Sequence, residues 1–190
     1  MKITKTKIKN LLIIEPEVFE DERGFFVETY NKDRYVENGI NVDFVQDNLS
    51  QSMKGVLRGL HFQKEPYAQG KLVQVITGSV LDVAVDIRHG SETFGQWVSV
   101  KLSGENKKQF WIPAGFAHGF VSLEDDTIFN YKCTNLYNKK SEGAIAWNDA
   151  HLDIDWQLGQ YGIREPIVSK KDKENTAFCN IDKDFVYEKK

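Results

Sequence analysis

Cysteine is scarce in this sequence, and its scarcity excludes two kinds of protein. Only Cys133 and Cys179 occur among the 190 residues. They are too few and too far apart to form a disulfide framework or a metal knuckle. Two isolated cysteines fit a reducing compartment, so we expect the protein to be cytoplasmic.

Long hydrophobic runs are absent as well. A lysine-rich N-terminus is followed by an apolar run at residues 11–14, which Glu15 ends before it reaches the length of a signal-peptide core. No later segment approaches the roughly 18 apolar residues that a membrane helix needs. We therefore expect a soluble protein with no membrane partner.

The sequence also has no excess of positive charge. Its 25 Lys and Arg residues stand against 28 Asp and Glu residues, for a net charge of −3. Because a polyanion is bound by a strongly basic surface, we expect no nucleic-acid partner, whereas a local cationic pocket for one small anion stays possible. Hydrophobic residues make up 41% of the chain, which is typical of a globular domain with its own core.

What the sequence does contain is a series of short β-prone runs separated by turn residues, with little helical periodicity. A turn at Thr77-Gly78-Ser79 joins the clearest hairpin. This spacing is typical of an antiparallel sandwich or barrel. We predict one short helix at residues 31–38, ended by Gly39. The predicted strands are residues 11–14, 25–30, 42–48, 56–63, 72–76, 80–87, 97–102, 109–112, 116–123 and 127–134.

No linker, repeat or low-complexity block interrupts the chain, so we expect residues 1–190 to form a single domain. Its motifs lie between about residues 21 and 172, and a polar, lysine-rich tail begins at Ser169. Such a tail is typical of a solvated helix or a frayed end. His89 and His151 lie beside turn residues, and we expect both at the surface.

Two other histidines lie in motifs that suggest chemistry. His61 belongs to Gly55-Val-Leu-Arg-Gly-Leu-His-Phe-Gln63, three residues after Arg58 and ten before Lys71. His118 belongs to Pro113-Ala-Gly-Phe-Ala-His-Gly119, which matches the P-x-G-x-x-H pattern of the second cupin motif. That motif points to a jelly roll made of two sheets.

Metal-binding cupins also have a His-x-His pair and a Glu in their first motif, but here His61 is followed by Phe62 and Gln63, so the pair is absent. Two separated histidines do not complete the three or four ligands of a catalytic metal, so we expect no metal. The sequence has no serine nucleophile elbow and no Gly-rich dinucleotide loop, which leaves acid–base chemistry. An unperturbed histidine has a pKa of about 6.5 and a tyrosine about 10, so His61 and Tyr131 are a candidate base and acid. Alternation groups Tyr131 with Phe129 and Cys133, and a core position is equally open to it.

Seven sequence blocks resemble, in order, those of the dTDP-4-dehydrorhamnose 3,5-epimerase family. The resemblance covers most of the chain and implies an all-β, cupin-like jelly roll with short peripheral helices. It implies an isomerase of dTDP-rhamnose biosynthesis that epimerises dTDP-4-dehydro-6-deoxy-D-glucose at C3 and C5 without a cofactor. The blocks are Asp21-x-Arg-Gly-x-Phe-x-Glu28, Gly55 to Gln63, Gln69-Gly-Lys-Leu-Val73, Leu81-Asp-Val-Ala-Val-Asp-Ile-Arg88, Ile112-Pro-x-Gly-Phe-Ala-His-Gly-Phe120, Asn130-Tyr-Lys-Cys-Thr134 and Ser169-Lys-Lys-Asp172.

The resemblance also implies roles for individual residues. His61 would remove a proton and be oriented by Asp172, while Lys71 would stabilise the enolate oxygen. Tyr131 would return a proton from the opposite face. The implied substrate contacts are Arg23, Phe26, Glu28, Gln46, Asp47, Asn48, Arg58, His118, Tyr137, Glu142 and Lys171.

Members of the family dimerise by exchanging N-terminal strands, and we expect a homodimer here. Residues 25–30 carry large side chains on both faces, as a strand does when it adds to the edge of a neighbour's sheet. One point of geometry is open. Strict alternation places Arg58 and His61 on opposite faces of their strand, so either Gly59 marks a bulge or Arg58 serves another part of the site.

Three other functions are compatible with parts of this pattern. The first is an epimerase that acts on another nucleotide-linked 4-ketosugar, or on one carbon only. The second is a non-catalytic sugar- or nucleotide-binding cupin, which would not need all four of the catalytic residues present here. The third is a metal-dependent cupin oxygenase, which the missing His-x-His pair disfavours.

Overall fold

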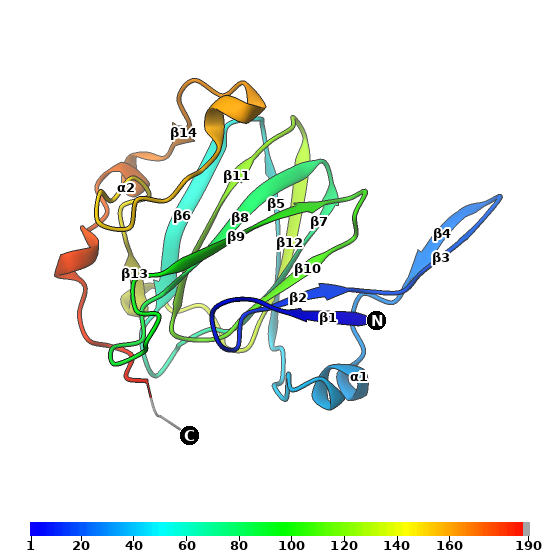
Figure 1. Cartoon of the computed structure of the whole chain (residues 1–190), viewed down its shortest axis with the longest axis horizontal. Coiled ribbons are helices and arrows are strands. Elements are labelled where there is room, and N and C mark those ends of the chain that lie inside the picture. Colours follow the sequence, from blue (N-terminus) through cyan, green and yellow to red (C-terminus); the bar gives the residue numbers. More distant parts are fainter. Residues whose placement is uncertain (188–190) are drawn as a thin grey trace.

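A computed structural model describes residues 1–187, which form two packed antiparallel β-sheets (Figure 1). In the first sheet the strand order is β1 (Lys2–Lys5), β2 (Leu12–Glu15), β10 (Gln109–Ile112), β7 (Lys71–Thr77), β12 (Thr127–Cys133) and β5 (Gln46–Ser52). In the second it is β13 (Glu142–Ala144), β6 (Val56–Gln63), β11 (Phe116–Ser122), β8 (Ser79–Asp86) and β9 (Trp97–Ser103). The predicted all-β jelly roll is confirmed.

Short elements surround the two sheets. A hairpin of β3 (Val18–Asp21) and β4 (Gly24–Val27) projects from the body of the molecule (Figure 1). Helix α1 (Lys32–Glu37) follows the hairpin, and β14 (Ile167–Val168) runs parallel to β6 just before helix α2 (Lys170–Lys173). The described chain also contains three 3-10 helical turns, η1 (Lys139–Ser141), η2 (Leu158–Tyr161) and η3 (Phe178–Asn180).

The core has three clusters of buried hydrophobic side chains, two of them on either side of the second sheet and a third formed by Ile14, Tyr35, Ile40, Leu72 and Trp111. Between the sheets, Phe129 of β12 and Phe110 of β10 pack with Phe120 of β11. On the far face of the second sheet, Val83 and Val85 of β8 pack against the C-terminal third of the chain. Because both of its faces are covered, every residue of β8 is buried.

The polar tail was predicted wrongly. Instead of standing in solvent, it docks on the second sheet through Phe178 and Phe185, which are 5% and 9% exposed. Fully burying a phenylalanine side chain contributes about 1.5–3 kcal/mol, enough to hold a charged segment in place. His89, expected at the surface, is half-buried, since its ring packs on Phe94 and its Nε2 atom is buried. His151 is exposed, as predicted.

Eight of the ten predicted strands and the helix are confirmed to within one or two residues. The other two differ. The strand predicted at residues 42–48 begins only at Gln46 and runs to Ser52, and the one predicted at residues 25–30 ends at Val27. Strands β1, β3, β13 and β14 were not predicted.

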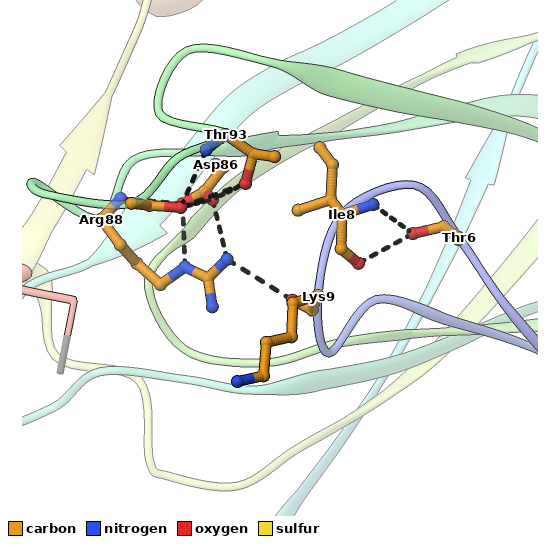
Figure 2. Close-up of polar contacts among 7 residues, drawn as sticks. Thr6, Ile8, Lys9, Asp86, Arg88 and Thr93 are labelled. Atoms are coloured by element: carbon orange, nitrogen blue, oxygen red, sulfur yellow. Dashed lines mark hydrogen bonds and ion pairs between the residues drawn. The ribbon is translucent and has the colours of Figure 1, made fainter. Parts of the chain in front are cut away.

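A buried ion pair between Asp86 and Arg88 holds the end of β8 in place (Figure 2). The Asp86 carboxylate is fully buried and accepts hydrogen bonds from Arg88 Nε at 2.8 Å and Thr93 Oγ1 at 2.7 Å. Arg88 also donates to the backbone oxygen of Lys9 at 3.4 Å, and the Tyr187 ring lies 5.0 Å from its guanidinium. Removing one partner of such a pair costs about 3–5 kcal/mol, so we interpret it as structural.

Candidate active site

A pocket of about 510 Å³ is lined by polar, titratable side chains from both sheets. Strands β5, β6, β7, β11 and β12 line it, together with the segment that carries β14 and α2. Its volume is within the range of about 300–1,000 Å³ that small-molecule sites occupy. Seven of the predicted site residues line it: Arg58, His61, Lys71, His118, Tyr131, Lys171 and Asp172.

A β-bulge in β6 explains how Arg58 and His61 reach the same pocket. His61 is paired with His118 and Arg58 with Phe120, so three steps along β6 match two along β11. The extra residue shifts the alternation by one position. Gly59 has a φ of +141°, and a Cβ atom there would lie 2.6 Å from the Cα atom of Gly119. The bulge predicted as one of two alternatives is therefore present, and it requires glycine.

His61 is held by Asp172 from the far end of the chain. Its Nε2 atom lies 2.6 Å from Oδ1 of Asp172, whose side chain is only 6% exposed. Burial alone would raise the pKa of Asp172, but the hydrogen bond and charge of His61 keep that pKa below its usual value. With a proton on Nε2 shared with this carboxylate, Nδ1 is the nitrogen that can accept a proton.

A second histidine–carboxylate pair lies beside the first. His118 Nε2 lies 2.9 Å from Oδ2 of Asp82, and both residues are buried. Burial raises the pKa of Asp82 and lowers that of His118, while their mutual attraction opposes both shifts. A neutral His118 that donates from Nε2 has an unprotonated Nδ1, which is a hydrogen-bond acceptor.

Lys71 and Tyr131 supply a cation and a hydroxyl. Burial lowers the pKa of Lys71, although nearby Cys133 and Asp82 counteract the effect. Among residues 1–187 the Lys71 ammonium has no hydrogen-bond partner, and it lies 5.9 Å from the centre of the Tyr131 ring. Burial raises the pKa of Tyr131, so its hydroxyl keeps its proton at neutral pH and can donate it.

The rim of the pocket carries a second polar network. Lys171 Nζ forms an ion pair with Oε2 of Glu142 at 2.6 Å, and the Tyr137 hydroxyl donates to the same oxygen at 3.3 Å. Gln46 Oε1 accepts a hydrogen bond from the Tyr137 backbone nitrogen at 2.9 Å. Gln46 Nε2 also donates to Asn48 Oδ1 on the same strand at 3.0 Å. Through Tyr137, which bonds to both Gln46 and Glu142, the network joins β5 to β13.

Four predicted site residues lie elsewhere in the chain. Arg23 and Phe26 are on the projecting hairpin, where Arg23 pairs with Asp21 and Phe26 is 68% exposed. Glu28 follows the hairpin and pairs with Arg34 at 3.1 Å. Asp47 pairs with Lys132 at 2.9 Å on the side of β5 opposite to Gln46 and Asn48.

Asp82 and Ser169 belong to the site but were not predicted as site residues. Asp82 holds His118, and Ser169 lines the pocket. Alternation in residues 81–88 places Asp82 on the same side as Ala84, opposite to Val83. A buried carboxylate in such a strand needs a partner, which could have suggested its role.

No group of three or more His, Cys, Asp or Glu side chains within residues 1–187 is placed to hold a metal ion. None of the helices in this part of the chain is long and apolar enough to span a bilayer.

Comparisons of this chain with known proteins all indicate the same kind of enzyme. The sequence profile of the family described as dTDP-4-dehydrorhamnose 3,5-epimerase matches residues 5–180. A curated relative of that name from Salmonella typhimurium is 57% identical over 173 residues, which cover 90% of this chain and 92% of the relative.

Two solved structures extend the comparison. That of dTDP-6-deoxy-D-glucose-3,5-epimerase from Legionella pneumophila, in complex with dTDP-4-keto-L-rhamnose, has a TM-score of 0.94, with 52% identity over 99% of both chains. That of a 3'-monoepimerase from Streptomyces bikiniensis, in complex with dTDP-quinovose, has a TM-score of 0.84 at 31% identity, covering 92% of this chain and 86% of the other.

Proposed function

Because the chain belongs to the dTDP-4-dehydrorhamnose 3,5-epimerase family, we propose that it converts dTDP-4-dehydro-6-deoxy-D-glucose into dTDP-4-dehydro-L-rhamnose. The enzyme is an isomerase, and the reaction inverts C3 and C5 of the sugar. One observation carries the proposal. A histidine–carboxylate pair, a half-buried lysine and a protonated tyrosine line one pocket of suitable size.

The first step is removal of a proton next to the ketone. Both C3 and C5 flank the C4 carbonyl, so loss of either proton gives an enolate. His61 accepts the proton on Nδ1, and Asp172 stabilises the resulting imidazolium through Nε2. The Lys71 ammonium stabilises the negative charge that develops on the C4 oxygen. Its lack of a partner in the described chain leaves it available for that oxygen.

The second step returns a proton to the opposite face of the enolate. Tyr131 donates its phenolic proton, and the carbon is inverted because His61 removed its proton from the other side. Exchange with water afterwards deprotonates His61 and reprotonates Tyr131. The cycle consumes no redox equivalents, so the proposed reaction needs no cofactor.

The nucleotide is bound mainly by polar groups around this centre. Arg58 is anchored by Ser52 Oγ at 3.3 Å and supplies a fixed charge for the diphosphate. Gln46 and Asn48 of β5, with Tyr137 hydrogen-bonded to Gln46, supply further groups for the nucleotide. The Glu142–Lys171 pair and His118 contribute further hydrogen-bonding groups for the sugar nucleotide.

Direct product analysis tests the proposed reaction. Purified protein treated with a chelator is incubated with dTDP-4-dehydro-6-deoxy-D-glucose, and the sugar is identified by NMR. We expect resonances of dTDP-4-dehydro-L-rhamnose. A product inverted at one carbon only would replace the proposal with a monoepimerase, and unchanged substrate would reject it.

Tyr131→Phe is expected to separate proton exchange from inversion. The variant lacks only the hydroxyl, which is needed for reprotonation, so exchange of the α-protons with solvent should persist while inversion at C5 falls. Both rates are measured by NMR on the same sample in heavy water. A fall of both by the same factor would contradict a separate acid role for Tyr131.

We further propose that two copies assemble into a homodimer in which the β3–β4 hairpin of each reaches the pocket of the other. Phe19, Phe25 and Phe26 are 54%, 57% and 68% exposed on that hairpin, an unusual amount of apolar surface for water. The outer strand β5 has a free edge and an exposed Leu49, so it can accept a partner. Arg23, Phe26 and Glu28 would then complete the nucleotide site of the neighbouring chain.

Subunit mixing tests this assembly. Glu28→Ala and His61→Asn proteins, each impaired alone, are combined under conditions that allow exchange. In a mixed dimer one site carries both defects and the other carries neither, so about a quarter of all sites should become intact. Activity well above the sum of the separate proteins is expected. No recovery despite proven exchange, or a monomer by light scattering, would contradict the proposal.

A further inference from the structure

The segment 167–175 brings Asp172 to the pocket with few contacts of its own. β14 pairs with β6 over only two residues, and the Ile167 backbone nitrogen donates to the Gly55 oxygen at 2.8 Å. Helix α2 has four residues, a single turn. Because so short a helix is not stable alone, the groups that cap it determine where Asp172 lies.

Ser169 is the N-cap of this turn. Its backbone is extended, with φ −61° and ψ 155°, and its Oγ atom accepts a hydrogen bond from the Asp172 backbone nitrogen at 3.0 Å. In a capping box the acidic side chain at this third helical position bonds back to the cap residue. Here the Asp172 carboxylate bonds to His61 instead. The serine hydroxyl therefore fixes the backbone of the residue whose side chain holds the base.

The other support of Asp172 is weaker. Asn175 Nδ2 lies 3.4 Å from Asp172 Oδ1 and 3.4 Å from the Gly59 backbone oxygen, near the limit of a hydrogen bond. Ser169 makes the shorter contact, and it also contributes to the lowered pKa of Asp172. Together with the backbone bond from the Lys173 nitrogen to the Ser169 oxygen at 3.1 Å, the cap thus fixes the turn that carries Asp172.

We propose that Ser169 is a positioning residue for the general base, acting through Asp172 and not through contact with the substrate. Its hydroxyl holds Asp172 so that the His61 proton stays on Nε2 and Nδ1 stays free to accept one. The inference rests on the proposed epimerase function for its kinetic test, and on the geometry alone for its spectroscopic test.

The kinetic test compares Ser169→Ala with Ser169→Thr. Loss of an N-cap hydroxyl is expected to lower kcat about five- to ten-fold, with KM and the affinity for dTDP within about two-fold of wild type. Threonine keeps the hydroxyl and should restore most of kcat. If the alanine variant does not fold, Ser169→Gly, which keeps most of the cap's stability, is used with the same expectation.

Ser103→Ala is the matched control. Ser103 Oγ accepts the backbone N–H three residues later, from Asn106 at 2.9 Å, in the turn after β9 and away from the pocket. The bond has the same donor, acceptor and sequence spacing as the one that Ser169 makes. We expect a similar fall in melting temperature and an unchanged kcat. An equal fall in kcat for both variants would mean that Ser169→Ala acts only by destabilising the protein, and this would overturn the proposal.

Nitrogen-15 NMR of the imidazole rings supplies a readout that needs no turnover. In the wild type we expect His61 as a single Nε2–H tautomer, and in Ser169→Ala a mixture of tautomers. If the wild type fails to turn over, the proposed function falls while this measurement still tests the positioning role. An unchanged His61 spectrum in the variant, or a loss confined to KM, would overturn the inference.

Discussion

His61→Asn is expected to lower kcat by about 100- to 10,000-fold, the usual effect of removing a general base. Asparagine occupies a similar volume and can still donate to Asp172, so the pair's place in the fold is kept while the proton-accepting ring is lost. The 2.6 Å contact with a carboxylate that is almost fully buried is the reason to assign the role to His61. The measurement is steady-state turnover, with circular dichroism to confirm the fold.

His151→Asn serves as the control for this variant. His151 is exposed and stacks on Phe178 with ring centres 5.7 Å apart, on the covered side of the second sheet and away from the pocket. It should turn over substrate like the wild type. If His61→Asn keeps more than about a tenth of wild-type activity, far above the expected range, another group is the base.

Lys71→Met should lower kcat by about 100- to 1,000-fold, the cost of losing one stabilising group for an oxyanion. Methionine keeps most of the length of the side chain and removes the charge. Lys71 is half-buried, with its ammonium near the Tyr131 ring and without a hydrogen-bonded partner in the described chain, so its charge is available to the C4 oxygen. Because the enolate itself is destabilised, α-proton exchange should fall as far as inversion does.

This joint loss distinguishes Lys71 from Tyr131, for which only inversion is expected to suffer. NMR in heavy water follows both rates in each variant. Lys101→Met, which removes an exposed charge from β9, should leave both rates unchanged. Exchange at the wild-type rate in Lys71→Met would mean that the enolate forms without the lysine, and its assigned role would be wrong.

The strands of the two sheets could be predicted because the sequence pattern that defines a strand lies within the strand itself. Alternating residues and turn glycines define strands such as β6 and β8, whatever their partners are. The bulge at Gly59 could be offered only as an alternative, since it is defined by the pairing of β6 with β11. The close approach that requires glycine at position 59 is to Gly119, which lies 60 residues further along the chain.

The tail was misread for a related reason. It is rich in lysine and has no apolar periodicity, yet Phe178 and Phe185 anchor it on a sheet formed earlier in the chain. The composition of the tail describes its average polarity, whereas two phenylalanine side chains determine where the tail lies. The resemblance to the family located Asp172 because a motif records such long-range pairings. Asp82 was missed because nothing near it in the sequence indicates that it meets His118.

The most direct test of the account is the position of solvent label in the product. The wild-type protein is incubated with dTDP-4-dehydro-6-deoxy-D-glucose in heavy water, and deuterium is located by NMR and mass spectrometry. Proton removal by His61 and return from solvent-exchanged Tyr131 predict one deuterium at C3 and one at C5 of an inverted sugar. Two results would contradict the enolate mechanism. One is a product that carries no deuterium at C3 and C5, and the other is substrate that stays unchanged and takes up no deuterium at either carbon.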